Sequence, residues 1–438
     1  MKTTDLVAIK WKYSPRIIDH HIEHLLEISD AILLKGPKWC GKSWTGAFFS
    51  NSVLDFQDIE DGKKNIELVN SAPAIAISTP KPLLIDEWQD AEIIWDIVRK
   101  KVDMGLNDKF ILTGSVTPSS IKNFKSSNTE QKKHSGSGRI IQVQMYPMTF
   151  YEKHKTEISI SISELLNGKQ LENGLLSKLT VYDIANEIVQ GGWPKTRNLD
   201  SSDAQILVGG YINAIADDDT LKYRNIRINA KLVNKLLFSW TRNISTYSSY
   251  ETIYKDVIGI LIKPISLPTF KSYISVLKDM YLIDEIEPWS PNVRSKTRVR
   301  GTTKKILIDP SIGCASNNIT AQKLVGDLNY LGFFFENLVI RDLKAFSEVT
   351  NWKILQYRDN SGLEVDAILE LGNDEYAAVE IKLSNFHKQE AVENLKRFYK
   401  KMEKTYKAPK LMIVIVGIGS FTEVIDGVHV IPYEFLKN

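Results

Sequence analysis

Residues Ala31-Ile-Leu-Leu-Lys-Gly-Pro-Lys-Trp-Cys-Gly-Lys-Ser43 contain the clearest structural motif of the chain. Its apolar beginning, Ala31 to Lys35, predicts a short buried strand, and Gly36 to Ser43 fits the GxxxxGK[ST] pattern of a phosphate-binding loop. Such a loop wraps its main-chain N–H groups around phosphate oxygens, and the following helix N-terminus adds positive potential. We therefore expect a nucleotide to be bound by Gly36, Pro37, Lys38, Trp39, Cys40, Gly41, Lys42, Ser43 and Trp44.

A second apolar run, Pro82 to Asp86, predicts another strand, and it ends in two carboxylates, Asp86 and Glu87. Ligands of open α/β sheets bind at the carboxyl ends of the strands, where these side chains would lie. In this interpretation the nucleotide is ATP with Mg²⁺, Ser43 and Asp86 hold the metal, and Glu87 is the catalytic residue that polarises the attacking water. For Glu87, a solvated strand end is the alternative.

Two further positions could contact the phosphates. Phe110 to Ser115 is a third apolar run ending in small polar residues, so Thr113 or Ser115 is placed to sense the terminal phosphate. Arg139 could contact phosphate within its own chain, or act across a subunit boundary of a homo-oligomer as an arginine finger, a contact that strongly accelerates hydrolysis. A structural salt bridge is the alternative for Arg139.

The composition is that of a soluble globular protein with more than one domain: 438 residues, 43% hydrophobic and 25% charged. The formal net charge of +3 is small, so nucleic-acid binding would need a local basic patch. Two cysteines, Cys40 and Cys314, exclude a disulfide framework and fit a reducing compartment. The sequence has neither the plan of a signal peptide nor an apolar run of about 18 residues, so we expect a cytoplasmic protein without a membrane partner.

The order of helical and strand-like segments predicts an α/β multidomain protein. Residues 1–155 would form a P-loop ATPase domain with a parallel sheet, and residues 156–228 a helical lid interrupted by the turn Gly191–Pro194. Residues 229–310 contain three helical stretches followed by a hairpin, the order of a winged-helix domain. Residues 311–438 return to mixed α/β structure.

In this last domain, acidic residues and a lysine are predicted to converge. Glu380 and Lys382 are two positions apart in a strand-like run, so their side chains share a face. The sequence Gly372-Asn-Asp374 predicts a hairpin turn that brings Asp366 close to that face, and Glu336 lies in a helical run. A carboxylate pair beside a lysine results.

With these residues in hand, the chain resembles a widespread prokaryotic family of AAA-type ATPases that couple a P-loop domain to a C-terminal domain of unknown function. The resemblance implies an ATPase core, a helical lid, a winged helix and a C-terminal domain similar to the restriction-endonuclease fold. It rests on Tyr13-Ser-Pro-Arg-Ile-Ile-Asp19, Gly36 to Trp44, Leu83-Leu-Ile-Asp-Glu-Trp-Gln-Asp90, Ile111-Leu-Thr-Gly-Ser115, Gly138-Arg139, Tyr146-Pro-Met-Thr-Phe-Tyr-Glu152 and Gly191-Gly-Trp-Pro194.

The C-terminal carboxylates and lysine are similar to the active site of the PD-(D/E)xK nuclease superfamily. By that resemblance, Asp366 and Glu380 would be Mg²⁺ ligands, since hard oxygen ligands suit this ion. Lys382 would assist the attacking water as a catalytic residue, and Glu336 would be the additional helix acid. A plain surface ion-pair cluster and an inactive relic of a nuclease fold are the alternatives.

A basic patch precedes this domain, with no acidic residue between its first and last members: Arg294, Lys296, Arg298, Arg300, Lys304 and Lys305. On an extended wing the first four would project on one face and contact DNA phosphates, while the preceding helix offers Lys271, Ser272 and Lys278. Packing of the winged helix against protein is the alternative.

The sequence thus favours an ATPase whose nucleotide state repositions a winged helix and a Mg²⁺-dependent nuclease-like domain on DNA. A second hypothesis is a nucleotide-gated DNA- or protein-binding switch with a catalytically inactive nuclease-fold domain. A third is an ATP-driven scaffold for protein partners that does not bind nucleic acid.

Overall fold

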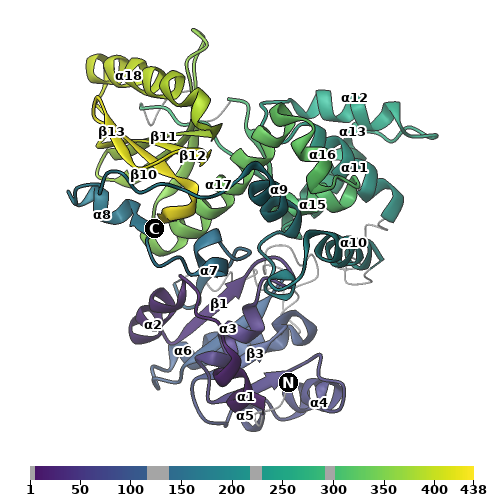
Figure 1. The fold of residues 1–438 in the computed structure, drawn as a ribbon. Coiled ribbons are helices and arrows are strands. Elements are labelled where there is room, and N and C mark those ends of the chain that lie inside the picture. Colours follow the sequence, from purple (N-terminus) through teal and green to yellow (C-terminus); the bar gives the residue numbers. More distant parts are fainter. Residues whose placement is uncertain (1–4, 116–137, 218–228, 292–300) are drawn as a thin grey trace. The chain divides into compact units, whose positions relative to one another are not determined.

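The computed structural model describes residues 5–115, 138–217, 229–291 and 301–438 (Figure 1). The chain divides into two compact units, one built mainly from the first 146 residues and the other from most of the remaining chain. The four-domain division expected from the sequence is finer, and its boundaries stay predictions.

The first unit contains a five-stranded sheet in the order β2-β3-β4-β1-β5. All of its strand pairs are parallel, which fits a P-loop nucleotide-binding core. The three strands predicted from the sequence are confirmed as β1, β3 and β4. The strands are β1 Ala31–Lys35, β2 Ser52–Asp55, β3 Leu83–Asp86, β4 Phe110–Gly114 and β5 Ile141–Gln144. The helices are α1 Asp5–Lys12, α2 Asp19–Ile28, α3 Lys42–Phe48, α4 Gly62–Ser71, α5 Pro73–Ala76, the 3₁₀ turn η1 Trp88–Ala91 and α6 Ile93–Asp103.

The centre of this sheet is fully buried, because helices cover it as they do in parallel sheets generally. Gly46 of α3 packs so closely that a Cβ atom there would lie 2.7 Å from the Leu84 side chain. Trp88 and Trp95 fill the other part of the core, with their ring centroids 4.9 Å apart. The close packing of α3 fixes the position of the loop that precedes it.

The second unit begins with a helical region. Its turn at residues 191–194, predicted from two glycines and a proline, is confirmed between α9 and α10. The elements are α7 Phe150–His154, β6 Ile160–Ser161, α8 Ile162–Leu166, α9 Val181–Gln190, η3 Pro194–Thr196 and α10 Ser201–Asp217, joined from later in the chain by α15 Pro310–Ser316 and α16 Ala321–Val325. The short β6 pairs in parallel with β15, Leu436–Lys437.

Three helices and an antiparallel pair of strands follow, in the predicted order. They are α11 Ala230–Arg242, α12 Tyr250–Gly259, α13 Leu267–Asp279, β7 Ile283–Ile286 and β8 Lys304–Leu307. The register of the pair places Ile286 opposite Lys304 and Ile283 opposite Leu307. We refer to β7 and β8 together as the hairpin.

The C-terminal part is a six-stranded mixed sheet in the order β13-β14-β12-β11-β10-β9. The hairpin turn predicted near Gly372 is confirmed, since β10 and β11 are antiparallel and Asn373 and Asp374 between them have positive φ. Figure 1 shows α17 and α18 on opposite sides of this sheet. The elements are α17 Leu328–Thr350, β9 Lys353–Arg358, β10 Glu364–Gly372, β11 Glu375–Ser384, η5 Asn385–His387, α18 Lys388–Thr405, β12 Leu411–Ile418, β13 Glu423–Ile425, β14 Val428–Pro432 and η6 Tyr433–Phe435.

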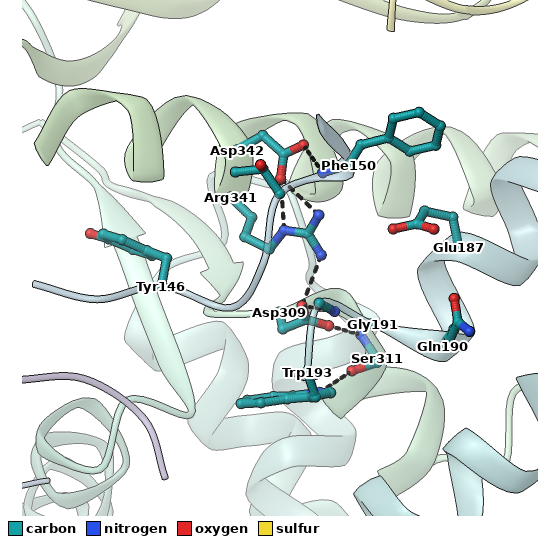
Figure 2. A network of polar contacts seen from close by, with 12 residues as sticks. Tyr146, Phe150, Glu187, Gln190, Gly191, Trp193, Asp309, Ser311, Arg341 and Asp342 are labelled. Atoms are coloured by element: carbon teal, nitrogen blue, oxygen red, sulfur yellow. Dashed lines mark hydrogen bonds and ion pairs between the residues drawn. The ribbon is translucent and has the colours of Figure 1, made fainter. Parts of the chain in front are cut away.

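A buried ionic network ties distant segments of the second unit together (Figure 2). Arg341 of α17 pairs with Asp309 at 2.9 Å and with Asp342 at 2.7 Å. Asp342 also accepts hydrogen bonds from the Phe150 N–H at 3.0 Å and the Tyr433 hydroxyl at 2.8 Å. These charges are fully buried and are compensated by each other and by hydrogen bonds, as buried charges must be.

The turn at residues 191–194 belongs to the same network. The Gly192 N–H donates to Asp309 at 2.9 Å, and the Trp193 indole donates to Ser311 at 2.9 Å. A Cβ atom on Gly192 would lie 2.3 Å from the Met148 carbonyl oxygen, so only glycine fits there. The motif Gly191–Pro194 therefore has a structural role in this unit.

No helix among the described residues is long and apolar enough to cross a lipid bilayer.

Candidate functional site

The predicted phosphate-binding loop lies between β1 and α3, as its sequence requires. Its backbone has positive φ at Gly36 (+150°), Trp39 (+70°) and Gly41 (+104°). A Cβ atom on Gly36 would lie 2.3 Å from the Met145 carbonyl oxygen, so a side chain is excluded there. The loop thus has the curvature that lets successive main-chain N–H groups point toward one anion.

Lys42 begins α3, and its ammonium group turns back into the loop. It donates hydrogen bonds to the main-chain carbonyls of Gly36 at 3.1 Å and Pro37 at 2.9 Å, and the residue is 5% exposed. Both acceptors are uncharged, so these bonds are weaker than a bond to an anion. The terminal phosphates of a nucleotide could therefore replace them.

Asp86 lies at the carboxyl end of β3 and accepts hydrogen bonds from the hydroxyls of Thr113 and Ser43. Burial and the Glu87 carboxylate raise the pKa of Asp86 to about 6, and Asp55, paired with it in register at the end of β2, adds to the effect. Asp55 is a member of this site that the sequence analysis missed. Buried negative charge collects here, and a bound cation would compensate for it.

Glu87 follows Asp86 and has a left-handed backbone conformation, with φ +54°. This conformation costs a residue other than glycine about 1–3 kcal/mol, and such strain is typical of functional positions. The Glu87 N–H donates to Thr113 at 3.2 Å, and its carboxylate accepts hydrogen bonds from Gln89 and, at 3.5 Å, from Ser115. The side chain is therefore oriented from two sides.

A segment before β1 supports the loop, and the sequence analysis gave it no role beyond a family landmark. Arg16 donates to the carbonyl of Cys40 at 2.8 Å and to that of Tyr146 at 2.9 Å. The Tyr13 hydroxyl donates to Asp19 at 2.7 Å and lies 3.1 Å from the Thr45 hydroxyl on α3. These contacts fix the loop from its outer side.

The other predicted contact residues have the following environments. Thr113 is buried and bonds to both Asp86 and the Glu87 N–H, so it orients the carboxylates. Arg139 forms an ion pair with Asp103 at 2.5 Å, the structural salt bridge that the sequence analysis left as an alternative. Trp39, within the loop, is 40% exposed, and Trp44, in the first turn of α3, is 45% exposed. Their roles toward a nucleotide stay predictions.

Comparisons with known proteins agree with this geometry. Residues 29–154 match the model of an AAA domain. That match supports a P-loop ATPase of the AAA type in the first unit. Residues 181–323 and 331–436 match two domains of unknown function, DUF8612 and DUF4143, and no curated protein matches the chain.

Three solved structures resemble the chain remotely. A Walker-type ATPase of Pyrococcus abyssi is 16% identical, with 69% of this chain and 96% of that chain covered and a TM-score of 0.41. The Orc1 protein of Aeropyrum pernix in complex with DNA is 12% identical, with 69% and 93% covered and a TM-score of 0.23. McrB hexamers with bound McrC from Thermococcus gammatolerans give 11% identity, 80% and 73% coverage and a TM-score of 0.20.

The residues at the loop fit ATP with Mg²⁺. Ser43 and Asp86 are hydrogen-bonded to each other next to the start of α3, and burial together with the Glu87 carboxylate raises the pKa of Asp86. Across the described parts of the chain, no three His, Cys, Asp or Glu side chains are grouped to hold a metal ion by themselves. A metal held by one hydroxyl, one carboxylate and the phosphates of its nucleotide agrees with both observations.

A second cluster of charged side chains lies in the C-terminal sheet, and we call Glu336, Asp366, Glu380, Lys382 and Lys304 the carboxylate–lysine cluster. Lys382 pairs with Glu380 at 2.7 Å and with Asp366 at 3.6 Å. Glu380 accepts a further hydrogen bond from Asn394 of α18 at 2.7 Å, and Asp366 accepts one from the Ile381 N–H at 3.0 Å. The convergence of these predicted residues on neighbouring strands is confirmed.

Lys304 of β8 is the member that the sequence analysis did not include. Its ammonium group lies 2.6 Å from Glu336 Oε1 and 3.3 Å from Asp366 Oδ1, and the side chain is 2% exposed. Tyr247 covers it, with the ammonium 5.3 Å from the ring centroid.

The prediction of a basic patch is wrong for its last two members. Lys304 and Lys305 are buried in β8, and Lys305 pairs with Glu285 at 2.6 Å, so neither is available to a DNA backbone. Glu285 also pairs with Lys278, the predicted groove contact on α13. The patch members Arg294, Lys296, Arg298 and Arg300 lie outside the described residues.

The charges in the carboxylate–lysine cluster are strongly coupled. Burial would raise the pKa of Asp366, but Lys304 and Lys382 lower it below its ordinary value. Burial and Asp366 raise the pKa of Glu380, whereas burial raises that of Glu336 to about 7 although Lys304 lowers it. Asp366 is thus the most stable anion of the cluster, and both lysines contact it.

These residues do not fit a resident divalent ion in the arrangement that the structure shows. Each carboxylate contacts a lysine ammonium: Lys304 bridges the helix acid Glu336 and Asp366, and Lys382 contacts Asp366 and Glu380. The assignment of Asp366 and Glu380 as metal ligands therefore stays a prediction that needs Lys304 to be displaced.

Proposed function

We propose that this protein is a Mg²⁺-dependent ATPase whose nucleotide state controls the binding of its second unit to DNA. The ATPase proposal is carried by one observation: within the described residues, Lys42 donates to two uncharged main-chain carbonyls of the loop, next to the hydrogen-bonded Ser43 and Asp86.

The residues of the first unit have distinct roles in this proposal. Lys42 turns from the carbonyls to the terminal phosphates, and the loop N–H groups bind the phosphate oxygens. Glu87, oriented by Gln89 and Ser115, accepts a hydrogen bond from the attacking water and directs it at the terminal phosphate. Mg²⁺, when bound with the nucleotide, neutralises charge on the phosphates.

Replacement of Glu87 by glutamine tests the catalytic role separately from binding. Glutamine keeps the shape and can still bond to Gln89, but it lacks the charge that orients the water. We expect hydrolysis to fall by about 100-fold or more, the size of typical general-base contributions, while ATP affinity changes less than about threefold. Phosphate release at the wild-type rate in Glu87→Gln would contradict the role.

The DNA proposal concerns α11, α12, α13 and the hairpin, whose order is that of a winged helix. Lys271 on α13, one of the candidate contacts named from the sequence, is exposed, which supports its use as a phosphate contact in this proposal. The connection between β7 and β8 contributes Arg294, Lys296, Arg298 and Arg300. Because Lys278, Lys304 and Lys305 are engaged in ion pairs, the proposal now depends on this connection and on Lys271.

Salt dependence distinguishes DNA binding from binding to a protein partner. Contacts from three of the arginines and lysines to phosphates predict a log–log slope of roughly −2.7 for DNA affinity against salt. The double change Arg298→Ala/Arg300→Ala should reduce this slope by roughly 2, whereas Lys231→Ala, at an exposed position on α11, should leave it unchanged. Equal DNA affinity before and after the double change would favour a scaffold for protein partners.

For the C-terminal sheet, the contacts favour the non-cleaving alternative. All three acids of the carboxylate–lysine cluster are engaged by lysines, which supports a switch whose nuclease-like domain does not cut. The test is incubation with single- and double-stranded DNA and RNA in Mg²⁺. Cleavage that disappears in Asp366→Asn or Lys382→Met while ATP hydrolysis persists would establish the nuclease instead.

A further inference from the structure

The position of Lys304 is set by the fold of β8. Asn337 of α17 is buried and bonds to both main-chain groups of Leu307: its amide donates to the carbonyl at 2.9 Å, and its oxygen accepts from the N–H at 2.8 Å. The Trp240 indole donates to the Ile306 carbonyl at 2.8 Å. These bonds hold β8 against α17 one residue from Glu336.

The neighbouring residue is fixed as well. Lys305 donates its N–H to the Thr246 carbonyl at 2.9 Å and accepts from the Ser245 N–H at 2.7 Å. Its side chain points away from the cluster to Glu285, because adjacent strand residues face opposite sides. Main-chain hydrogen bonds of the residues that follow Lys304 in β8 therefore hold it in the cluster. A lysine on an exposed surface is not held in this way.

The charges that surround Lys304 match a cation. Glu336 comes from α17 and Asp366 from β10, and Tyr247 presents its ring to the ammonium. Lys382 of β11 supplies the second ammonium group of the cluster and contacts Asp366 and Glu380. Arg358 pairs with Glu364 at 2.9 Å and lies over the same Tyr247 ring, 4.8 Å from its centroid. The cluster thus contains the ammonium groups of both its lysines and the carboxylates of Glu336, Asp366 and Glu380.

We propose that Lys304 is the resident cation of the carboxylate–lysine cluster: its ammonium group occupies the place between Glu336 and Asp366, and a divalent metal ion binds there only when Lys304 is removed. A magnesium ion needs oxygen ligands at about 2.0–2.1 Å in octahedral geometry, so an ion placed between these two acids competes with the Lys304 ammonium for Glu336 Oε1 and Asp366 Oδ1. This inference deepens the non-cleaving alternative for the second unit and does not depend on ATP hydrolysis.

The test uses the full chain without nucleotide and Mn²⁺ as the probe, counted by electron paramagnetic resonance of the free ion. Wild type is expected to bind no Mn²⁺ at the cluster. Lys304→Met, which keeps the length of the side chain and removes its charge, is expected to gain one Mn²⁺ per chain. The thermal midpoint of this variant should also rise by a few degrees at saturating Mn²⁺, because the ion binds only the folded state.

Two controls make the result specific. Lys305→Met removes a buried, ion-paired lysine from the same strand and is expected to gain no Mn²⁺ site. Adding Asp366→Asn to Lys304→Met is expected to abolish the gained site. Should Lys304→Met be unfolded in metal-free buffer, Mn²⁺ is expected to restore its folding, while Lys304→Arg, which keeps a cation, folds without metal.

Three results would overturn the proposal. The first is Mn²⁺ binding by wild type that Asp366→Asn removes, because it would place a metal beside Lys304. The second is a folded Lys304→Met protein that gains no Mn²⁺ site. The third is a Lys304→Met protein that Mn²⁺ fails to fold while Lys304→Arg is folded.

Discussion

The phosphate-binding loop and the carboxylate–lysine cluster contain the same kinds of side chain but use lysine in opposite ways. Lys42 donates to two main-chain carbonyls, and the nearby Asp86 is hydrogen-bonded by hydroxyls. Lys304 and Lys382 instead contact carboxylates directly. In the first site the opposite charges are kept apart, and in the second they neutralise each other.

The difference indicates which site can accept a ligand. A hydrogen bond to a neutral carbonyl contributes about 0.5–1.5 kcal/mol, so a phosphate can replace the partners of Lys42 at small cost. Breaking a buried ion pair costs about 3–5 kcal/mol, so an incoming ion displaces Lys304 only with difficulty. The phosphate-binding loop can therefore accept a ligand more easily than the carboxylate–lysine cluster. The two sites contain similar residue types, and they differ in the groups that their lysines contact.

The largest expected effect is that of Lys42→Ala on ATP hydrolysis. Loss of the ammonium from the terminal phosphates should lower kcat/KM by about 1000-fold, or roughly 4 kcal/mol, the upper range for one group that stabilises transition-state charge. Phosphate release measures it. Lys35→Ala is the matched control, since this half-buried lysine next to the loop bonds to Gln142, and it should stay within about twofold.

Arg341→Met measures how much a buried ionic network contributes to the stability of the second unit. The change leaves Asp309 and Asp342 without their cation, so the free energy of unfolding of the second unit should fall by about 3–4 kcal/mol in urea titrations. Arg397→Ala, at an exposed position on α18, should cost less than about 0.5 kcal/mol. Equal effects of the two changes would mean that buried ion pairs in this protein contribute little to stability. The argument that Lys304 is hard to displace from Glu336 and Asp366 would then fail.

The pH dependence of stability at the Lys153–Glu187 pair also tests whether buried ion pairs stabilise this protein. Although burial raises it, Lys153 and His154 lower the pKa of Glu187 to about 2 in the folded state, from the ordinary value of 4.5. The stabilisation, about 3 kcal/mol at most, is complete above pH 4.5 and is lost as the pH falls toward 2. In Glu187→Gln, the free energy of unfolding should therefore fall less steeply between pH 4.5 and pH 2 than in wild type. An equally steep fall in both proteins would contradict the lowered pKa of Glu187.

The smallest effect is expected for Tyr13→Phe. Phenylalanine keeps the stacking on Phe48, at 4.3 Å between ring centroids, and removes only the hydroxyl that bonds to Asp19 and Thr45. The free energy of unfolding of the first unit should fall by about 1 kcal/mol, with ATP hydrolysis retained. A loss of hydrolysis beyond about tenfold would show that this segment acts in catalysis and does more than hold α3.

The sequence was sufficient where local patterns determine structure. Gly36 to Ser43 predicted the loop between β1 and α3, and the spacing of Glu380 and Lys382 with the turn at Gly372 predicted their approach to Asp366. It failed for Lys304, which looked like one of a run of exposed basic residues. Lys304 is 62 positions from Asp366, and its place depends on Asn337 holding β8, a tertiary contact that no local pattern encodes. Arg16, whose partner Cys40 is 24 positions away, was missed for the same reason.

The most direct test of the contrast between the two sites is the number of Mn²⁺ ions bound by wild-type protein with and without a non-hydrolysable ATP analogue. We predict one ion per chain with the analogue, lost in Lys42→Ala, and none without it. An ion that binds without nucleotide and disappears in Asp366→Asn would contradict the account.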